Sequence, residues 1–346
     1  MNLILRSTIA FSMIGLAACQ QAVRPQQQEM PSTVVGTVAP ISPPISPPEM
    51  PPTPATAEPA EPAAVEPAPD PAHSSGADVF QRLRAGLEPG ACEAGGAIAR
   101  RWQQRLAVNP PLFAKHLEKV LPLMDYVARE VDAAGLPAVF ALIPLVESDY
   151  RPNAVGKGSP LGLWQMIPST ARNHGIAIKP GYDGRLSPVE STHAALSYLQ
   201  LLQPMFKSWQ ESVMAYNAGE NRVRRALANW PGQEVGNGDR HPSGLNNVTY
   251  HYLAKLQALS CMIEQPEQAG VELPMDARFE RLRELTLDPD ISSIEQLADR
   301  LGIGAKFLRD LNPVYRGGRV AKGVPRQVLV PFAAANGAMS PAATAP

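Results

Sequence analysis

The sequence of 346 residues predicts a mainly α-helical fold, in which an all-α domain is followed by a small α/β unit. Between residues 98 and 265, apolar residues recur at helical spacing and alternating, strand-like runs are almost absent. After residue 271 the pattern changes to strand, helix, helix and strand. We therefore divide the chain into a leader (1–19), a disordered tether (20–77), an all-α domain (78–270), an α/β unit (271–332) and a flexible tail (333–346).

The leader has the pattern of an export signal. Arg6 precedes an apolar run that is too short to cross a bilayer. The leader ends in "LAAC", which resembles the processing box of bacterial lipoproteins and implies that Cys19 is lipidated. An ordinary signal peptide with a chance cysteine is the alternative. Gln20 after the cysteine resembles the outer-membrane sorting pattern, so we expect an outer-membrane lipoprotein of the cell envelope that faces the periplasm.

Residues 20–77 are rich in Pro, Ala and Glu and contain almost no large apolar side chain. Such a segment cannot form a core, so we expect it to be extended, semi-rigid and disordered. At about 3.1 Å per residue in the polyproline limit, it would reach on the order of 100 Å. A lipid anchor followed by this tether would let a folded domain work at a distance from its membrane.

Composition excludes several classes of partner. A formal net charge of -1 argues against nucleic acid, which requires a dense basic surface. We expect no cofactor and no metal, because phosphate-binding motifs are absent and the six histidines lack ligand-like spacing. Cys92 and Cys261 lie near the two ends of the main folded region, and an oxidising compartment favours a disulfide between them. Two buried free thiols are the alternative.

Three helical segments come first in the all-α domain. Residues 113–135 place apolar side chains on one face, and a Gly and a Pro then stop the helix. Residues 137–148 are almost wholly apolar, so this segment must lie inside the domain. Residues 187–206 begin with a capping box, in which Ser187 is the cap and Glu190 follows three residues later.

Two more helical segments complete the domain, and two short helices belong to the α/β unit. Residues 209–230 form a helix with a break at Asn217, and residues 246–263 close the domain after a Gly- and Asn-rich insertion. In the α/β unit we expect Ser292 and Glu295 to cap the first helix. The flanking segments "RLRELTL" and "RQVLVP" alternate like short strands.

Glu147 ends the apolar run "ALIPLVESDY", an unfavourable setting for a carboxylate. Burial among aliphatic side chains and the negative end of its own helix both raise the expected pKa. No Lys or Arg lies within one turn before it to offset these effects. A glutamate that stays protonated near neutral pH is suited to general-acid catalysis. The alternative is a side chain that leaves the helix end for solvent or caps a neighbouring element.

Three motifs occur in one order and spacing: "VESDY", then "GLWQMIPSTA", then "AYNAGENRV". Together they resemble the lytic transglycosylases of the soluble-type catalytic fold, which is related to goose-type lysozyme. The family that matches best is membrane-bound lytic murein transglycosylase D. The resemblance implies a lysozyme-like all-α domain that binds peptidoglycan glycan strands. It also implies a lyase reaction at the β-1,4 bond between N-acetylmuramic acid and N-acetylglucosamine, which leaves 1,6-anhydromuramoyl ends.

The resemblance also implies roles for individual positions. Glu147 would act first as the acid and then as the base, taking a proton from the sugar 6-hydroxyl. Tyr216 would steady the carboxyl or the acetamido group, unless it is simply a core aromatic. Trp164 would pack behind the sugar cleft. The family's serine nine residues after the acid is Gly156 here, and Ser159 is a candidate to compensate. The positions expected to hold the loop or bind substrate are Ser148, Ser159, Gln165, Met166, Tyr216, Asn217 and Tyr252.

The segments "LGIGAKFLRDLNP" and "VLVP" of the α/β unit resemble a degenerate lysin-motif (LysM) module, which binds chains containing N-acetylglucosamine. The usual opening signature of that module is missing, and a unit that only packs on the catalytic domain is the alternative. Two rival functions also remain at this point. One is a hydrolase of lysozyme type on the same fold, and the other is a non-catalytic lipoprotein that binds peptidoglycan.

Overall fold

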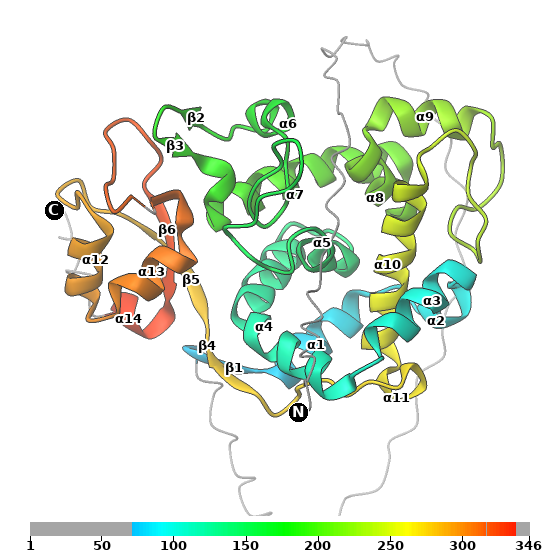
Figure 1. The fold of residues 1–346 in the computed structure, drawn as a ribbon, viewed down its shortest axis with the longest axis horizontal. Coiled ribbons are helices and arrows are strands. Elements are labelled where there is room, and N and C mark those ends of the chain that lie inside the picture. The colour runs from blue at the N-terminus through cyan, green and yellow to red at the C-terminus, as the bar shows by residue number, and fades with distance from the viewer. Residues whose placement is uncertain (1–70, 316, 337–346) are drawn as a thin grey trace, which may run out of the picture. The chain divides into compact units, whose positions relative to one another are not determined.

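The computed structural model describes residues 71–315 and 317–336, which Figure 1 shows in colour. Cys19 and the rest of the leader, the tether up to residue 70 and the tail from residue 337 lie outside the described residues. Within the described ranges, no helix is long and apolar enough to cross a membrane.

Helices dominate the chain up to Ala269, as the periodicity predicts. Between them lie two 3₁₀ turns, η1 (Ala138–Leu142) and η2 (Gly184–Leu186), and a hairpin of β2 (Ile178–Lys179) with β3 (Tyr182–Asp183). The helices are α1 (Gly76–Gly86), α2 (Ala91–Ala94), α3 (Ala97–Leu106), α4 (Pro110–Ala133), α5 (Ile143–Glu147), α6 (Pro168–Asn173), α7 (Pro188–Phe206), α8 (Trp209–Ala218), α9 (Glu220–Ala228), α10 (Asn247–Glu264) and α11 (Pro266–Ala269).

Helix α4 begins at Pro110, three residues before the predicted segment 113–135. Proline suits the first turn of a helix, and the Asn109 side chain accepts a hydrogen bond from the Leu112 amide. The apolar segment 137–148, predicted as one helix, is instead the turn η1 followed directly by the short helix α5. Its side chains are almost completely buried, as their apolar composition requires.

The start of α7 confirms Ser187 as its cap. The Ser187 hydroxyl accepts a hydrogen bond from the Glu190 amide, and Pro188 occupies the first helical position. In a capping box the Glu190 carboxylate would also accept a hydrogen bond from the backbone amide of Ser187, but here it makes a different contact. That carboxylate accepts a hydrogen bond from the Tyr182 hydroxyl, which ties the hairpin to α7.

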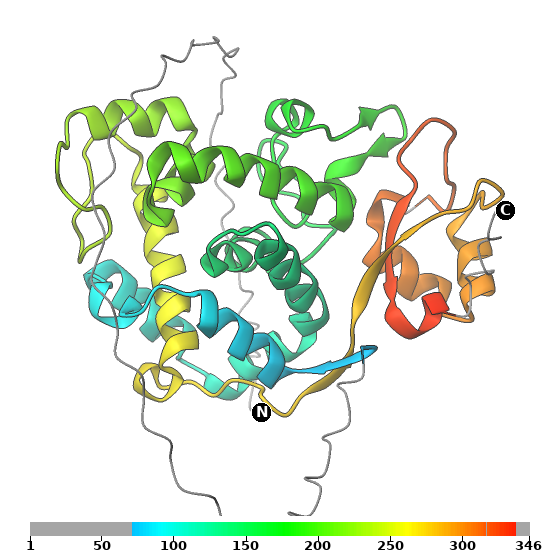
Figure 2. The same ribbon diagram turned by 180° about the vertical axis from the view of Figure 1, so that it is seen from behind.

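One apolar cluster runs through the helical part, and α5 lies inside it. Trp164, Phe140 and Met124 are among its completely buried side chains. Both views place α5 in the middle of the helical part, with α10 beside it (Figures 1 and 2). Interiors of this kind are packed as densely as organic crystals. The residue that ends α5 is therefore presented by a rigid support.

The order strand, helix, helix, strand predicted for residues 271–332 is confirmed. Strand β5 (Leu282–Thr286) pairs antiparallel with β6 (Gln327–Pro331), and α12 (Ile294–Leu301) and α13 (Ala305–Leu311) lie between them in the chain. The cap of α12 is Ser293, one residue after the predicted Ser292, and its hydroxyl accepts a hydrogen bond from the Gln296 amide. A second apolar cluster fills this unit.

The predicted end of the tether at residue 77 is too late. His73–Ser75 form strand β1, which pairs antiparallel with β4 (Arg278–Glu280), and helix α1 follows at once. Figure 2 shows β1 beside the segment that leads into β5. At the other end, Phe332–Asn336 form helix α14, although the tail was expected to be flexible from residue 333.

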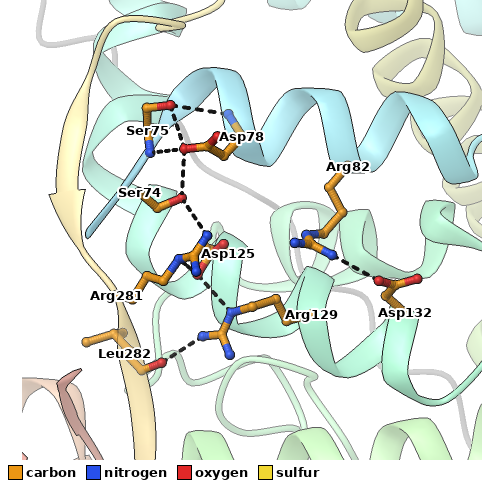
Figure 3. A network of polar contacts seen from close by, with 9 residues as sticks. All are labelled: Ser74, Ser75, Asp78, Arg82, Asp125, Arg129, Asp132, Arg281 and Leu282. Carbon is orange, nitrogen blue, oxygen red and sulfur yellow. Dashed lines mark hydrogen bonds and ion pairs between the residues drawn. The ribbon is translucent and has the colours of Figure 1, made fainter. Parts of the chain in front are cut away.

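Buried charges join the N-terminal and C-terminal segments (Figure 3). Asp125 on α4 is only 1% exposed and forms ion pairs with Arg129 and Arg281. Arg129 also donates to the Leu282 carbonyl, while Arg281 donates to the hydroxyl of Ser74 in β1. A buried carboxylate requires such partners, because an unpaired charge in the interior is very costly. The network therefore fixes β1 and the strand segment of the α/β unit on α4.

Cys92 and Cys261 form a disulfide, with their sulfur atoms 1.97 Å apart. The bond links α2 to α10 and confirms the predicted bridge over two free thiols.

Candidate active site

Glu147 is the last residue of α5 and is partly exposed, although the residues before it in the helix are buried. Loss of hydration among the surrounding side chains raises the pKa of Glu147 to about 7. Hydrogen bonding with Tyr252 and the positive charge of Lys255 act in the opposite direction and keep the pKa from rising further. The carboxyl can therefore hold a proton near neutral pH, and the residue keeps part of its surface accessible.

Tyr252 and Tyr216 bring two buried phenols to this carboxyl. Among the described residues, the Tyr252 hydroxyl has no partner in standard hydrogen-bond geometry, but it interacts with Glu147 strongly enough to lower the pKa of the acid. Burial raises the pKa of both phenols well above the ordinary value, and the charge of Glu147 adds to this effect. Both rings therefore stay neutral, and Tyr252 is placed to act as a hydrogen-bond donor.

The loop of residues 159–166 is tied down beside Glu147. The Ser148 hydroxyl lies 2.8 Å from the Leu163 carbonyl oxygen and 3.1 Å from that of Pro144. Ser148 is 1% exposed, so its side chain holds the loop, as expected, and does not line a substrate surface. The Tyr216 hydroxyl donates a hydrogen bond of 2.9 Å to the Trp164 carbonyl. The phenol predicted to face the acid thus also fixes this loop.

A buried arginine that sequence reasoning missed completes the loop's attachment. Arg185 is 5% exposed and forms an ion pair with Asp183, 2.7 Å between Nη2 and Oδ2. Its Nη1 donates to the carbonyls of Ser159 and Met166, at 2.5 and 3.1 Å. One guanidinium therefore holds both ends of the loop. The only sequence signal was the charge pair in "YDGR", which by itself indicates no more than a turn.

The other predicted site residues differ in how far their side chains are accessible. Trp164 is fully buried and donates to the Thr192 hydroxyl, and its expected place behind the sugar cleft stays a prediction. Met166, expected to line the cleft, is only 4% exposed and packs in the core. Asn217 is partly exposed and accepts a hydrogen bond from the Thr249 hydroxyl.

Gln165 adopts a left-handed backbone conformation with φ 46°, and its side-chain amide donates to the Gly162 carbonyl at 2.7 Å. This packing explains why position 156 is glycine. A Cβ at Gly156 would lie 2.5 Å from Gln165 Oε1 and 2.7 Å from Pro160 Cγ. The serine that the resemblance would place there would require Gln165 and Pro160 to shift. Ser159, the candidate replacement, is exposed.

No second carboxylate is among the groups that shift the pKa of Glu147. Asp149, two residues later, turns away and pairs with His116, with Nε2 and Oδ1 2.6 Å apart. Asp183 is occupied by Arg185. The two-carboxylate arrangement of most glycosidases is therefore not formed by the acidic residues nearest in the chain.

Lys255 and Trp102 are the nearby residues that the sequence did not identify. Lys255 is half-buried on α10, and its Nζ lies 4.4 Å from the centroid of the Trp102 ring. Its charge acts on Glu147, which lies in a distant part of the sequence. Neither residue belongs to one of the three recognised motifs, so only the folded chain reveals their proximity.

One group of side chains outside this site has ligand types suited to a metal. Glu130, His193 and Glu284 each place one such atom within 4.8 Å of the other two. His193 Nε2 already pairs with Glu284 Oε1 at 2.8 Å, and this hydrogen bond raises the pKa of His193. Glu284 also accepts a hydrogen bond from Tyr126. Because these contacts explain the cluster without an ion, we assign no metal there, and the absence of a metal stays a prediction.

Comparison with known proteins identifies the region around Glu147. Residues 128–235 match the family model described as the transglycosylase SLT domain. This chain contains an SLT domain. The match includes Glu147, the 159–166 loop and Tyr216, whereas Trp102 and Lys255 lie outside it.

Relatives that match this chain are named as lytic murein transglycosylases. Over 211 residues the chain is 33% identical to membrane-bound lytic murein transglycosylase D of Escherichia coli (strain K12). The aligned region covers 61% of this chain and 46% of that protein. It is 30% identical over 141 residues to membrane-bound lytic murein transglycosylase C of Haemophilus influenzae (strain PittGG), covering 35% and 38%. The chain thus spans less than half the length of these relatives. The 70-kDa soluble lytic transglycosylase from Escherichia coli aligns with a TM-score of 0.37 and 23% identity, covering 59% of this chain and 32% of that one.

Proposed function

We propose that this chain is a peptidoglycan lytic transglycosylase that uses Glu147 as its acid and then as its base. The observation that carries the proposal is the setting of Glu147. It lies in an SLT domain, is partly exposed, and has a pKa raised to about 7 by loss of hydration. A carboxylic acid with such a pKa is matched to general-acid and general-base catalysis near neutral pH.

The reaction follows from one carboxyl acting twice. Glu147 gives its proton to the glycosidic oxygen between N-acetylmuramic acid and N-acetylglucosamine, and the bond from that oxygen to the muramic C1 breaks. The Glu147 carboxylate then takes the proton of the muramic 6-hydroxyl, whose oxygen bonds to C1. The products are a chain with a free 4-hydroxyl and a 1,6-anhydromuramoyl end. No water is consumed, so a second carboxylate to activate water is not required.

The neighbouring side chains support these steps. Tyr252 can donate a hydrogen bond to the carboxylate that forms, because burial keeps its phenol neutral. We propose that Gln165, Asn217 and the exposed Ser159 contact the glycan, since all three are at least partly accessible. Ser148, Met166 and Tyr216 are buried and act by holding the loop and the core.

We also propose that lipidation of Cys19 anchors the protein in the outer membrane, with its folded part facing the periplasm. The lipobox and the Pro-rich composition of residues 20–70 support this placement. The helix pair between two strands supports a LysM-like unit that binds glycan. Labelling with radioactive palmitate should mark the parent but not Cys19→Ser, and equal labelling would exclude lipidation at this residue.

The decisive test is the mass of the fragments released from purified sacculi. Fragments one water lighter than reducing muropeptides support the transglycosylase, and fragments with reducing ends support a lysozyme-type hydrolase. Glu147→Gln should lower fragment release by at least about 10³-fold, the upper range for loss of a general acid or base. Asp149→Asn is the matched control, because that carboxylate turns to His116. If the folded parent binds sacculi but releases nothing, the non-catalytic reading replaces ours.

A further inference from the structure

Lys255 occupies a defined position behind the site. It follows Tyr252 by three residues on α10, so the two side chains project from the same side of that helix. Its stem is half-buried, and its ammonium lies 4.4 Å from the centroid of the Trp102 ring. An ammonium at this distance from an indole face is attracted by the electron density of the ring. Helices α3 and α10 thus hold the Lys255 ammonium between them.

Trp102 is itself held in place. Its ring nitrogen donates to His251 Nδ1 at 3.2 Å. Helix α3, which carries Trp102, begins at Ala97, and the amides of Ala97 and Ile98 donate to the Asp239 carboxylate at 2.9 and 3.1 Å. Asp239 belongs to the Gly- and Asn-rich insertion before α10. The insertion therefore anchors the helix that positions the ring.

Helix α10, which carries Lys255, packs beside α5, which ends at Glu147, and the charges of the two residues act on each other without a direct ion pair. Among the residues that the structure describes, Glu147 forms no ion pair within 4.0 Å. The charge of Lys255 nevertheless favours the ionised form of Glu147, and Glu147 favours the charged form of Lys255. A direct ion pair would keep the acid ionised and unable to give a proton. With no cation nearby, the carboxylate formed after proton donation would lack compensation in a poorly hydrated setting.

We propose that Lys255, held over the Trp102 ring, is a positioning residue that compensates the Glu147 carboxylate formed during the reaction without pairing with it. The catalytic meaning of this inference rests on the proposed function. The charge relation itself does not, because it concerns only groups of this chain.

Other titratable groups also face Glu147 or Lys255. Tyr252 from α10 and Tyr216 from α8 face Glu147 from the packed helices. Arg105 from α3 faces Lys255, and its guanidinium carbon lies 5.2 Å from the Trp102 centroid. Both phenols stay neutral because burial raises their pKa, so Lys255 is the cation whose removal tests the relation.

The experiment is a titration of Glu147 by ¹³C NMR on the full chain labelled at glutamate Cδ, with the resonance assigned by its loss in Glu147→Gln. Lys255→Met should raise the pKa of Glu147 by about one unit, the order of magnitude for loss of one unpaired charge near a partly buried site. Lys255→Arg should stay near the parent. Lys119→Met removes an exposed lysine of α4 and should leave the titration unchanged.

Trp102→Leu gives a prediction of opposite sign. Without the ring, the ammonium is free to approach Glu147, so the pKa of Glu147 should fall below that of the parent. An unchanged or raised pKa in this variant would exclude the role of the ring. An unchanged pKa of Glu147 in Lys255→Met would overturn the whole inference. Thermal unfolding shows whether Lys255→Met is folded. If it is not, Lys255→Gln is used in its place.

Activity provides an independent check. In Lys255→Met, the pH at which kcat falls on the alkaline side should move upward with the pKa of Glu147, and KM should change less than about twofold. A KM raised several-fold with an unchanged pH profile would mean that Lys255 contacts substrate instead. Because the NMR titration requires no turnover, it decides the inference even if the parent releases no fragments and the proposed function fails.

Discussion

Glu147 makes the stability of the fold depend on pH. Its pKa is raised from 4.5 to about 7 by loss of hydration, so the folded protein keeps this proton after the unfolded chain has released it. Between these pH values folding takes up a proton, and stability falls as the pH rises. Below about pH 4.5 both states are protonated and the cost disappears. Above about pH 7 the loss of stability caused by the ionised Glu147 is fully present and no longer changes with pH.

The first prediction concerns Glu147→Gln. Glutamine has nearly the same shape and cannot ionise. The free energy of unfolding of the variant should therefore exceed that of the parent by up to about 3 kcal/mol at pH 8. At pH 4 the two should be nearly equal. Urea unfolding at both pH values measures this difference. Glu118→Gln, on the exposed side of α4, is the control, and a gain of the same size at pH 4 would contradict the explanation.

At this scale the residues predicted the acid, the resemblance named Tyr216 and Tyr252 as site residues, and Lys255 was missed. An apolar run that ends in glutamate was enough to predict a raised pKa at Glu147. The groups that limit this rise, Tyr252 and Lys255, lie on α10, far along the chain. Local pattern carries no information about which distant charges meet. The prediction that no Lys or Arg lies within one turn before Glu147 is correct, and the cation that acts on Glu147 comes from the distant helix α10.

The loop 159–166 shows how single contacts act on an element. It has little regular structure, and it is fixed beside α5 by Ser148, Tyr216 and Arg185. Of these, Arg185 is the most demanding, because a buried guanidinium needs all its partners. Its ion pair with Asp183 and its two bonds to loop carbonyls satisfy that need together.

Arg185→Leu should therefore leave Asp183 partly buried without its partner and release both ends of the loop. We expect the free energy of unfolding to fall by about 3 kcal/mol, the usual cost of breaking a buried pair. Fragment release should fall at least tenfold at temperatures where the variant is folded. Urea unfolding and the sacculus assay measure the two effects. Arg172→Leu, on the exposed surface of α6, should change neither.

Elements with strong periodicity were predicted well, and those fixed by distant pairing were not. The amphipathic segment 113–135 and the cap Ser187 follow from local rules. The hairpin of β2 and β3 has only two residues in each strand, which is too short to show alternation. Segment 137–148 has the composition of a buried helix, but its first half is a 3₁₀ turn, a distinction that apolar composition does not make.

The disulfide acts on the whole molecule. Cys92 and Cys261 are 169 residues apart, so the bond closes a loop that includes nearly the entire helical part. In the chain-entropy model, a loop of this length should stabilise the fold by about 4 to 5 kcal/mol through restriction of the unfolded chain.

Replacement of both cysteines by alanine should remove that stabilisation and make unfolding independent of reductant. Urea unfolding of the parent and the double variant, each with and without reductant, measures this. Cys19→Ser is the control and should keep the full response. A double variant as stable as the oxidised parent would mean that the bond does not restrict the unfolded chain.

The division into an all-α domain and a strand–helix–helix–strand unit followed from the periodicity of apolar residues, but the joint between the two parts did not. Strand β1 has three residues in a polar segment, and nothing in "HSS" indicates its pairing with β4. Asp125 looked like an ordinary helix residue, yet it is buried and binds arginines from two segments. Such joints depend on shape complementarity between remote surfaces, which periodicity does not encode.

The position of β1 has a mechanical consequence. Any pull transmitted along the chain ahead of residue 73 would enter the fold through three residues laid along β4, and through Ser74 into the arginine and aspartate pair on α4. That tension would act first on the seam, meaning the β1–β4 pairing and the Asp125–Arg281 ion pair, before it reached α5. A protein dragged by its N-terminus would therefore loosen at the seam first, while the acid and its loop kept their geometry.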